Sequence, residues 1–211
     1  MKSMRREHIV LVLLGIFYSV GLIGLMQPAH QAYFLSLTPF NLMLTLGLLL
    51  WANGDFTKRS LIGFGLVGLL GWIIEWLGVH TGLLFGRYTY GHSLGSAMDG
   101  IPLIIGVNWL LLVLASRAVA ISWVEKPILQ HLIAAGCMTT LDFWIEPVAI
   151  KLDFWHWTEG VIPLQNYLMW FMTAFAMQVL LSFFEPKINR AVGFFVLTVQ
   201  FLFFTSLTLL L

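Results

Sequence analysis

Long runs of hydrophobic residues, separated by short polar stretches, fill most of this chain. A helix needs roughly 20 mainly apolar residues to cross a bilayer, and by that measure the pattern predicts seven spans in a single transmembrane domain, residues 1–211. The spans are expected near 9–26, 35–53, 61–79, 101–123, 128–146, 164–184 and 190–211. The sequence therefore predicts an all-α fold, a polytopic transmembrane helix bundle whose core is packed helix against helix.

The composition agrees with a membrane protein. Of the 211 residues, 59% are hydrophobic and only 10% are charged, which is the balance of a multi-pass protein. The net charge of +1 argues against nucleic acid as a partner, because binding to nucleic acid needs a concentrated basic face. The single cysteine, Cys137, offers neither a disulfide framework nor a cysteine metal site.

Basic residues are distributed unevenly over the expected loops. The loops opposite the N-terminus hold only Arg87 and Lys151. The loops on the side of the N-terminus, together with the N-terminal segment, hold Lys2, Arg5, Arg6, Lys58, Arg59, Lys126, Lys187 and Arg190. The positive-inside rule therefore predicts a multi-pass protein of the cell inner (cytoplasmic) membrane, with the N-terminus inside and the C-terminus outside. The first apolar run is long for a signal peptide, and it is expected to be a retained span.

Three carboxylates lie in these apolar runs: Glu75 in the third span, and Asp142 and Glu146 in the fifth. A carboxylate is expensive to keep inside a bilayer, so each is a candidate functional residue. All three lie toward the outer ends of their spans, and Asn108 and Asn166 enter the bundle from the same face. We therefore expect a polar pocket just under the outer surface.

Two outer loops, at 80–100 and 147–163, are longer than the other connections and rich in glycine, aromatic, histidine and acidic residues. Long structured loops are often functional, and these two are expected to roof the pocket. Tryptophans crowd the same zone, where they form either an interfacial belt or the lining of the pocket: Trp72, Trp76, Trp109, Trp144, Trp155, Trp157 and Trp170. Indole rings beside a proton donor would suit a reaction through a carbocation, which their faces attract.

Asp142 and Glu146 are four residues apart, so they share one side of a helix. Two carboxyl groups that close in a dry environment do not both ionise readily, and the pair titrates as a unit. One of the two is therefore expected to hold a proton and to be available as a general acid.

Two alternatives to this acid remain open. Asp142 could form an ion pair with Arg87 or Lys151, while Glu146, just before Pro147, caps or positions the loop. Glu75 could likewise be a satisfied polar contact between helices. The carboxylates could also bind a metal together with His80 and His156, although no zinc spacing such as H-E-x-x-H occurs.

Three blocks of the sequence resemble a known family. They read GWIIEWLGVHTGLLFGRYTYG at 71–91, GIPLIIGVNWLLL at 100–112 and TTLDFWIEPVAIKLDFWHWTEGVIPLQNYLMWF at 139–171. In order and content they are similar to the signature blocks of the integral-membrane carotenoid biosynthesis proteins, the CruF-type carotenoid hydratases, whose archaeal relatives include bisanhydrobacterioruberin hydratase. The blocks cover nearly a third of the chain, and long gapped motifs are far more specific than a single short pattern.

The resemblance implies a carotenoid 1,2-hydratase, a hydro-lyase of terpenoid metabolism that needs no cofactor and no metal. Such an enzyme adds water to the terminal isopropylidene double bond of an acyclic carotenoid end group and leaves a tertiary 1-hydroxy end. The substrate would be a lycopene-like polyene that enters from the bilayer, and other membrane enzymes of the carotenoid pathway are candidate partners.

Residues of this sequence fit those roles. Asp142 or Glu146 is expected to be the acid, and Glu75 the base or the residue that positions water. Four tryptophans are expected around the cation: Trp72, Trp76, Trp109 and Trp144. Further candidates for substrate binding are His80, Arg87, Tyr88, Asn108 and Asn166.

Two other functions would use similar residues. A membrane lycopene cyclase forms the same cation but captures it with an internal double bond. A proton-coupled transporter also has buried carboxylates, but it would be expected to carry polar groups on both sides of the midplane and inverted repeats, and no repeat is found in the sequence. A retinal photoreceptor is excluded, because the seventh span contains no lysine for a Schiff base.

Overall fold

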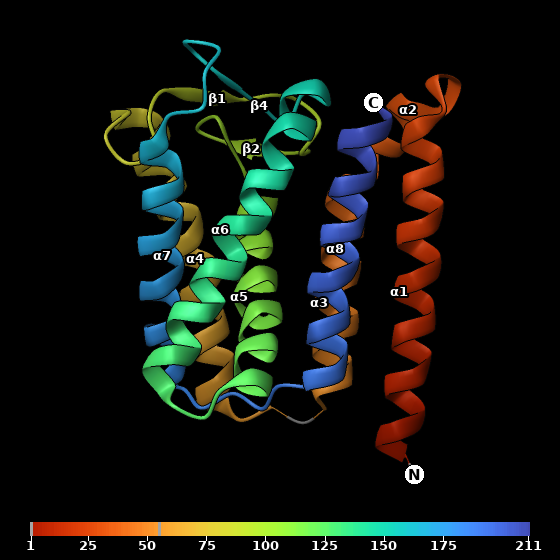
Figure 1. The fold of residues 1–211 in the computed structure, drawn as a ribbon, viewed down its shortest axis with the longest axis vertical. Helices are drawn as coiled ribbons and strands as arrows, with labels where there is room; N and C mark the ends of the chain where they lie inside the picture. Colours follow the sequence, from red (N-terminus) through yellow and green to blue (C-terminus); the bar gives the residue numbers. More distant parts are fainter. Residues whose placement is uncertain (1, 55) are drawn as a thin grey trace.

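The structure is a computed structural model that describes residues 2–54 and 56–211. Its long helices lie alongside one another in a bundle, and a short helix, α2 (Pro28–Ser36), follows the first of them (Figure 1). The long helices are α1 (Lys2–Met26), α3 (Thr38–Asn53), α4 (Lys58–Thr81), α5 (Ile104–Trp123), α6 (Pro127–Lys151), α7 (Leu164–Ser182) and α8 (Arg190–Leu210). The N-terminus and the connections α3–α4, α5–α6 and α7–α8 lie at one end of the bundle, whereas the C-terminus and α2 lie at the other (Figure 1).

Several of these helices could cross a membrane. Among the described residues, α1 from Met4 onward, α4, α5, α6 and α8 are long and apolar enough, and α2 with α3 adds a sixth crossing if this bent pair is one broken span. Helix α7 is not among them, since two glutamines and an asparagine lower its mean hydropathy. The predicted helical bundle is confirmed, and its long apolar helices support a membrane protein. Seven spans and their orientation stay predictions.

The second predicted span lies close to α3, but the helix α2 that precedes it was not predicted. A single helix was expected over 35–53, but the chain forms α2 and then bends by 57° into α3 at Leu37. Pro28 and Pro39 each lie in the first turn of their helix, where the missing N–H costs nothing. A proline there cannot continue a preceding helix, which places the break between Ser36 and Thr38.

The second outer loop is shorter than predicted, and the first is shifted along the chain to 82–103. Helix α6 continues through Pro147 to Lys151 instead of ending at Glu146, because Val148 and Ala149 beyond the proline are fully buried and their packing holds the helix together. Helix α4 ends at Thr81, where Gly82 adopts the left-handed conformation with φ of 64°.

The rest of the loops forms short strands, which an all-α fold did not anticipate. Strand β1 (Tyr88–Tyr90) pairs antiparallel with β4 (Trp155–Trp157), so the two outer loops are hydrogen-bonded to each other. Strand β2 (Ala97–Met98) pairs with β3 (Ile101–Pro102), and α5 therefore begins at Ile104 rather than at residue 101. The paired strands cover one end of the bundle (Figure 1).

Helices α4 and α5 pack at very close range because glycines face each other. A Cβ atom on Gly106 would lie 2.6 Å from the carbonyl oxygen of Gly68, and one on Gly71 would lie 2.5 Å from Cβ of Trp109. Small residues of this kind let helix backbones approach in a membrane. One turn beyond Gly71, the close approach brings Glu75 of α4 within hydrogen-bonding distance of Trp109 of α5.

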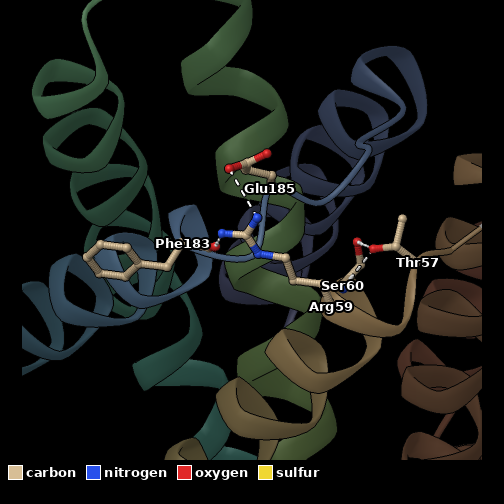
Figure 2. Close-up of polar contacts among 5 residues, drawn as sticks. All are labelled: Thr57, Arg59, Ser60, Phe183 and Glu185. Carbon is tan, nitrogen blue, oxygen red and sulfur yellow. Dashed lines mark hydrogen bonds and ion pairs between the residues drawn. The ribbon is translucent and has the colours of Figure 1, made fainter.

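The opposite end of α4 is fixed by polar contacts shown in Figure 2. Thr57 caps the helix, and its side-chain oxygen accepts a hydrogen bond from the backbone N–H of Ser60 at 3.0 Å. Arg59 donates to the carbonyl oxygen of Phe183 and lies 3.4 Å from Glu185. These bonds join α4 to the α7–α8 connection, although the ion pair is exposed and contributes at most about 1 kcal/mol.

Candidate active site

Glu75 is a buried carboxylate that accepts three hydrogen bonds from the protein. Its Oε2 accepts from the hydroxyls of Tyr88 and Tyr90, the second at 2.8 Å, and its Oε1 accepts from the indole N–H of Trp109 at 3.0 Å. The side chain is only 4% exposed. A buried carboxylate needs such donors in place of water, so this arrangement suits an ionised Glu75.

The β1–β4 strand pair supplies most of the donors. Tyr88 lies opposite Trp157, and Tyr90 lies opposite Trp155. Side chains alternate along a strand, so these four rings share the inner face, while Thr89 and its partner across the pair, an exposed histidine, face outward. Burial, followed by the charge of Glu75, raises the pKa of the Tyr88 and Tyr90 phenols well above their usual range. Both hydroxyls therefore stay protonated and serve as donors.

Glu146 on α6 is satisfied in the same manner. Its Oε2 accepts from the indole N–H groups of Trp155 and Trp157 at 3.0 and 2.8 Å, and its Oε1 accepts from Asn166 Nδ2 at 3.2 Å. The glutamate is 1% exposed. Because an indole N–H can only donate, two of the three partners require Glu146 to be an acceptor.

Asp142 differs from the two glutamates. It lies one helical turn before Glu146, as predicted, and the same Asn166 amide bridges both side chains. Its Oδ2 accepts from Asn166 at 2.9 Å, but its buried Oδ1 has no hydrogen-bond partner in the described part of the chain. Of the three carboxyl groups, Asp142 therefore has the fewest donors to stabilise a negative charge.

These residues line one end of a cavity of about 400 Å³. Glu75, Asp142, Glu146, Asn108 and Asn166 are all in its wall, together with Tyr88, Tyr90, Trp109, Trp155, Trp157 and Trp170. The rings of Trp109 and Trp170 are stacked, with centroids 4.5 Å apart and an interplanar angle of 17°. The predicted polar pocket under the loops thus exists, and its polar end is rimmed by aromatic rings.

The remainder of the cavity is mainly apolar and extends between the two halves of the bundle. It is lined by side chains of α1, α2, α3 and α8, which lie on the right in Figure 1. Four of these residues are also on the outer surface: Phe17, Val20, Tyr33 and Phe40, with exposed fractions of 40, 49, 64 and 56%. The cavity therefore opens sideways, toward the surface that lipid would cover.

Five of the predicted site residues lie outside the cavity wall. Trp76 donates to Asp99 at 2.6 Å and stacks on His80, which itself lies 3.2 Å from Asp99. Trp144 packs against Phe143, and its contact is edge to face. The other two are Trp72, which is half-buried at the α4–α5 contact, and Arg87, which is exposed.

The alternatives to an acid are not found in the geometry. Within residues 2–54 and 56–211, neither Arg87 nor Lys151 forms an ion pair with Asp142. His156 bonds Asp153 at 2.7 Å rather than a membrane carboxylate. No group of three histidine, cysteine or acidic side chains in that part of the chain could hold a metal ion.

Neither Tyr18 on α1 nor Gln200 on α8 was anticipated from the sequence as a polar residue of the cavity wall. A signal was present for Gln200, since a glutamine amid the apolar residues of a span is as conspicuous as a carboxylate. Tyr18 gave no such signal, because tyrosines are common near membrane interfaces.

Comparison with known proteins identifies the family of this chain. The carotenoid biosynthesis protein family matches residues 37–211, which include every carboxylate of the site. A bisanhydrobacterioruberin hydratase of Haloarcula japonica is 25% identical over 139 residues, which make up 60% of this chain and 46% of that protein, so the match spans less than half of the relative's length. No solved structure matches. Since the family match covers most of the chain, this protein belongs to the carotenoid biosynthesis protein family.

Proposed function

We propose that this protein is a cofactor-free hydratase that adds water to the terminal isopropylidene double bond of an acyclic carotenoid. One observation carries the proposal: Asp142 lines the polar end of a cavity that is mainly apolar elsewhere, and its buried Oδ1 accepts no hydrogen bond from the residues that the structure describes. The family and the name of the relative support a carotenoid substrate and a hydration reaction.

Asp142 is our candidate for the acid. Glu75 and Glu146 each accept three hydrogen bonds, which favours their charged forms, whereas Asp142 accepts one. Hydrogen bonds to a carboxylate are what stabilise its negative charge in a dry site. A single proton shared by the three groups would therefore reside on Asp142, and its unpartnered Oδ1 is free to present that proton to the cavity.

The reaction balances without any other reagent. The O–H bond of Asp142 breaks, a C–H bond forms at the less substituted alkene carbon, and a tertiary cation is left at the other carbon. A water molecule forms a C–O bond to the cation and loses a proton. Asp142 is the carboxylate with the fewest donors, so it is the strongest base of the three and recovers that proton, which completes the addition of one water.

The cation would be held by charge and by aromatic faces. Glu75 and Glu146 are fixed negative charges on two sides of the polar end, and the stacked rings of Trp109 and Trp170 offer the π surface. Of the tryptophans expected around the cation, only Trp109 is in the cavity wall. Tyr88 and Tyr90 place two hydroxyls beside Glu75, so we assign the positioning of water to this trio.

The sideways opening suits a substrate dissolved in lipid. A cavity of about 400 Å³ holds only the end group of a long polyene, and the rest of the chain would lie between Phe17, Val20, Tyr33 and Phe40 and continue into the bilayer. No partner enzyme is needed for this step, although neighbouring enzymes of the pathway could deliver the pigment through the same opening.

The placement in the membrane is part of the proposal. The long helices alternate in direction, which favours seven crossings with the broken pair α2–α3 and with α7 included. Lys58, Arg59, Lys126, Lys187 and Arg190 all belong to the end that carries the N-terminus (Figure 1). We infer that this end faces the cytoplasm and that the β1–β4 pair faces outward from the inner membrane.

Cysteine labelling in intact cells tests this orientation. In a Cys137→Ala background, Glu159→Cys on the β4 side should react with a membrane-impermeant thiol reagent, whereas Lys126→Cys on the other side should react only after the cells are permeabilised. The reverse pattern would refute the inferred orientation.

Two other functions make different predictions. A lycopene cyclase would give a product of unchanged mass. A proton-coupled transporter would need polar groups along a continuous path through the bundle. Gln178, which bonds both Arg117 and Ser116, is outside the cavity wall, and so are its two partners.

Pigment analysis tests the function directly. The chain is expressed in a bacterial host that accumulates lycopene, and the pigments are separated by liquid chromatography with mass detection. We expect a more polar pigment, heavier by one water, with the visible spectrum of lycopene. A product of equal mass with a shifted spectrum would indicate the cyclase instead. If well-expressed protein adds no water to any acyclic carotenoid offered, the proposal is wrong.

A further inference from the structure

The apolar part of the cavity contains a second polar feature, on the helices opposite the carboxylates. Gln200 of α8 donates from Nε2 to the hydroxyl oxygen of Tyr18 of α1 at 3.2 Å. Both residues line the cavity and both are buried, with exposed fractions of 3% and 5%. The Oε1 atom of Gln200 is buried and has no hydrogen-bond partner among the residues that the structure describes.

An unpaired amide oxygen is unfavourable at this place. The ring of Phe203 meets that of Tyr18 edge to face at 5.5 Å, and Phe204 and Leu207 line the same wall. In apolar surroundings a polar atom without a partner costs free energy that a bonded one does not. The hydrogen bond to Tyr18 fixes the amide, so Oε1 is held ready for a partner that arrives from the cavity.

The chemistry of that partner follows from the two side chains. Both are neutral, so the subsite is not built for an ion. A glutamine oxygen accepts hydrogen bonds and a tyrosine hydroxyl both donates and accepts, and a hydroxyl group is the ligand group that can satisfy either one. The ligand beside this O–H group would be mainly apolar, because most of the neighbouring wall is hydrocarbon and aromatic, with Thr38 and Asn41 as further polar residues.

We propose that Gln200 and Tyr18 form a second subsite that binds an O–H group within the substrate cavity. This inference rests on the hydratase proposed above. The O–H group has two possible sources: an alcohol on the same carotenoid end group that carries the reacting double bond, or the water that is consumed in the reaction.

The test uses two carotenoids and two variants. Membranes that contain the protein receive equal amounts of lycopene and of a lycopene analogue with one alcohol on the reacting end group. Gln200→Leu removes the amide, and Tyr18→Phe removes the hydroxyl but keeps the ring against Phe203. The rates of water addition to the two pigments are measured in the same sample, so their ratio is independent of the amount of folded protein.

Gln178→Leu is the matched control. Gln178 is also a fully buried glutamine, but its amide donates to the carbonyl oxygen of Val113 and to Ser116, and it is not in the cavity wall. This variant should leave the ratio of the two rates, and the rate per folded protein, unchanged.

The outcomes separate the two sources. If the alcohol binds here, Gln200→Leu and Tyr18→Phe lower the rate with the analogue by about twofold to tenfold relative to lycopene, which is the worth of one hydrogen bond. If water binds here, both variants lower kcat for both pigments equally, and KM stays constant. The proposal is overturned if neither the ratio nor kcat differs from the control. If the unaltered protein hydrates neither pigment, it is the proposed function that fails.

Discussion

The replacement of Asp142 by asparagine is the sharpest test of the assignment of the acid, because the structure predicts that it removes the proton while it preserves the fold. The introduced amide would keep an oxygen to accept from Asn166, as Asp142 Oδ2 does at 2.9 Å, and its NH2 group would occupy the place of Oδ1. Since no donor in the described residues bonds Oδ1, the introduced NH2 group would not face another hydrogen-bond donor. We expect the free energy of unfolding to change by less than about 1 kcal/mol.

Activity should fall far more. General acids contribute roughly 10²- to 10⁴-fold to a rate. An unactivated alkene does not react with water until it is protonated, so the proposed reaction cannot begin without an acid. We therefore expect Asp142→Asn to lower the rate by about 10³-fold or more, with initial rates measured in membranes supplied with lycopene and scaled to the amount of folded protein.

Glu146→Gln is the matched comparison, because it alters the same helix face by the same chemical change. The glutamine oxygen could accept from Trp155 and Trp157, but its NH2 group would then meet Nδ2 of Asn166, which is also a donor. We expect a loss of about 1–3 kcal/mol in stability, with measurable activity in the protein that remains folded. If Glu146→Gln abolishes activity while Asp142→Asn stays within tenfold of the unaltered protein, Asp142 is not the acid.

Three further predictions concern the roof and the opening of the cavity. Trp157→Phe removes a donor at 2.8 Å from Glu146 and should lower the free energy of unfolding by about 1.5–3 kcal/mol, the worth of a hydrogen bond to a charged group. Trp123→Phe, at an exposed position, is the control. Equal melting temperatures of the two variants would contradict a stabilising bond from Trp157 to Glu146. Hydrogen bonds from His156 and from the backbone N–H of His92 lower the pKa of Asp153, so its contribution to the β1–β4 pairing is present above pH of about 4 and is lost as the pH falls through the lowered pKa. The backbone N–H of Gly91 donates to Phe154, and its protection factor against hydrogen exchange, corrected for the intrinsic rate at each pH, should fall in acid. The fall should be smaller in Asp153→Asn, and equal pH profiles would argue against this role. Val20→Trp at the opening should raise KM for lycopene with little change in kcat. Val12→Trp, which is exposed on the same helix but outside the cavity wall, should leave KM unchanged. Equal KM values for the two variants would refute entry of the substrate beside Val20.

The tryptophans show where prediction from the sequence stopped. Trp76 follows Glu75 directly, so it points about 100° away around the helix, and Trp144 is two residues from both Asp142 and Glu146, so it points about 200° away from them. Residues so near a carboxylate in sequence therefore lie on a different face of the helix from it. The rings that do contact the carboxylates come mainly from β1 and β4, and their contacts depend on a strand register between loops more than 60 residues apart.

The sequence by itself determined the membrane class, the helical bundle and the polar end of the site. These follow from local physics: an apolar run long enough to span lipid, the cost of a carboxylate within it, and the four-residue spacing that aligns Asp142 with Glu146. The tertiary structure alone decided which carboxylate has the fewest donors, where the cavity opens, and that Tyr18 meets Gln200 across 182 residues of chain. Those features depend on how separate helices pack against one another, and hydrophobic periodicity along a chain does not specify which faces meet.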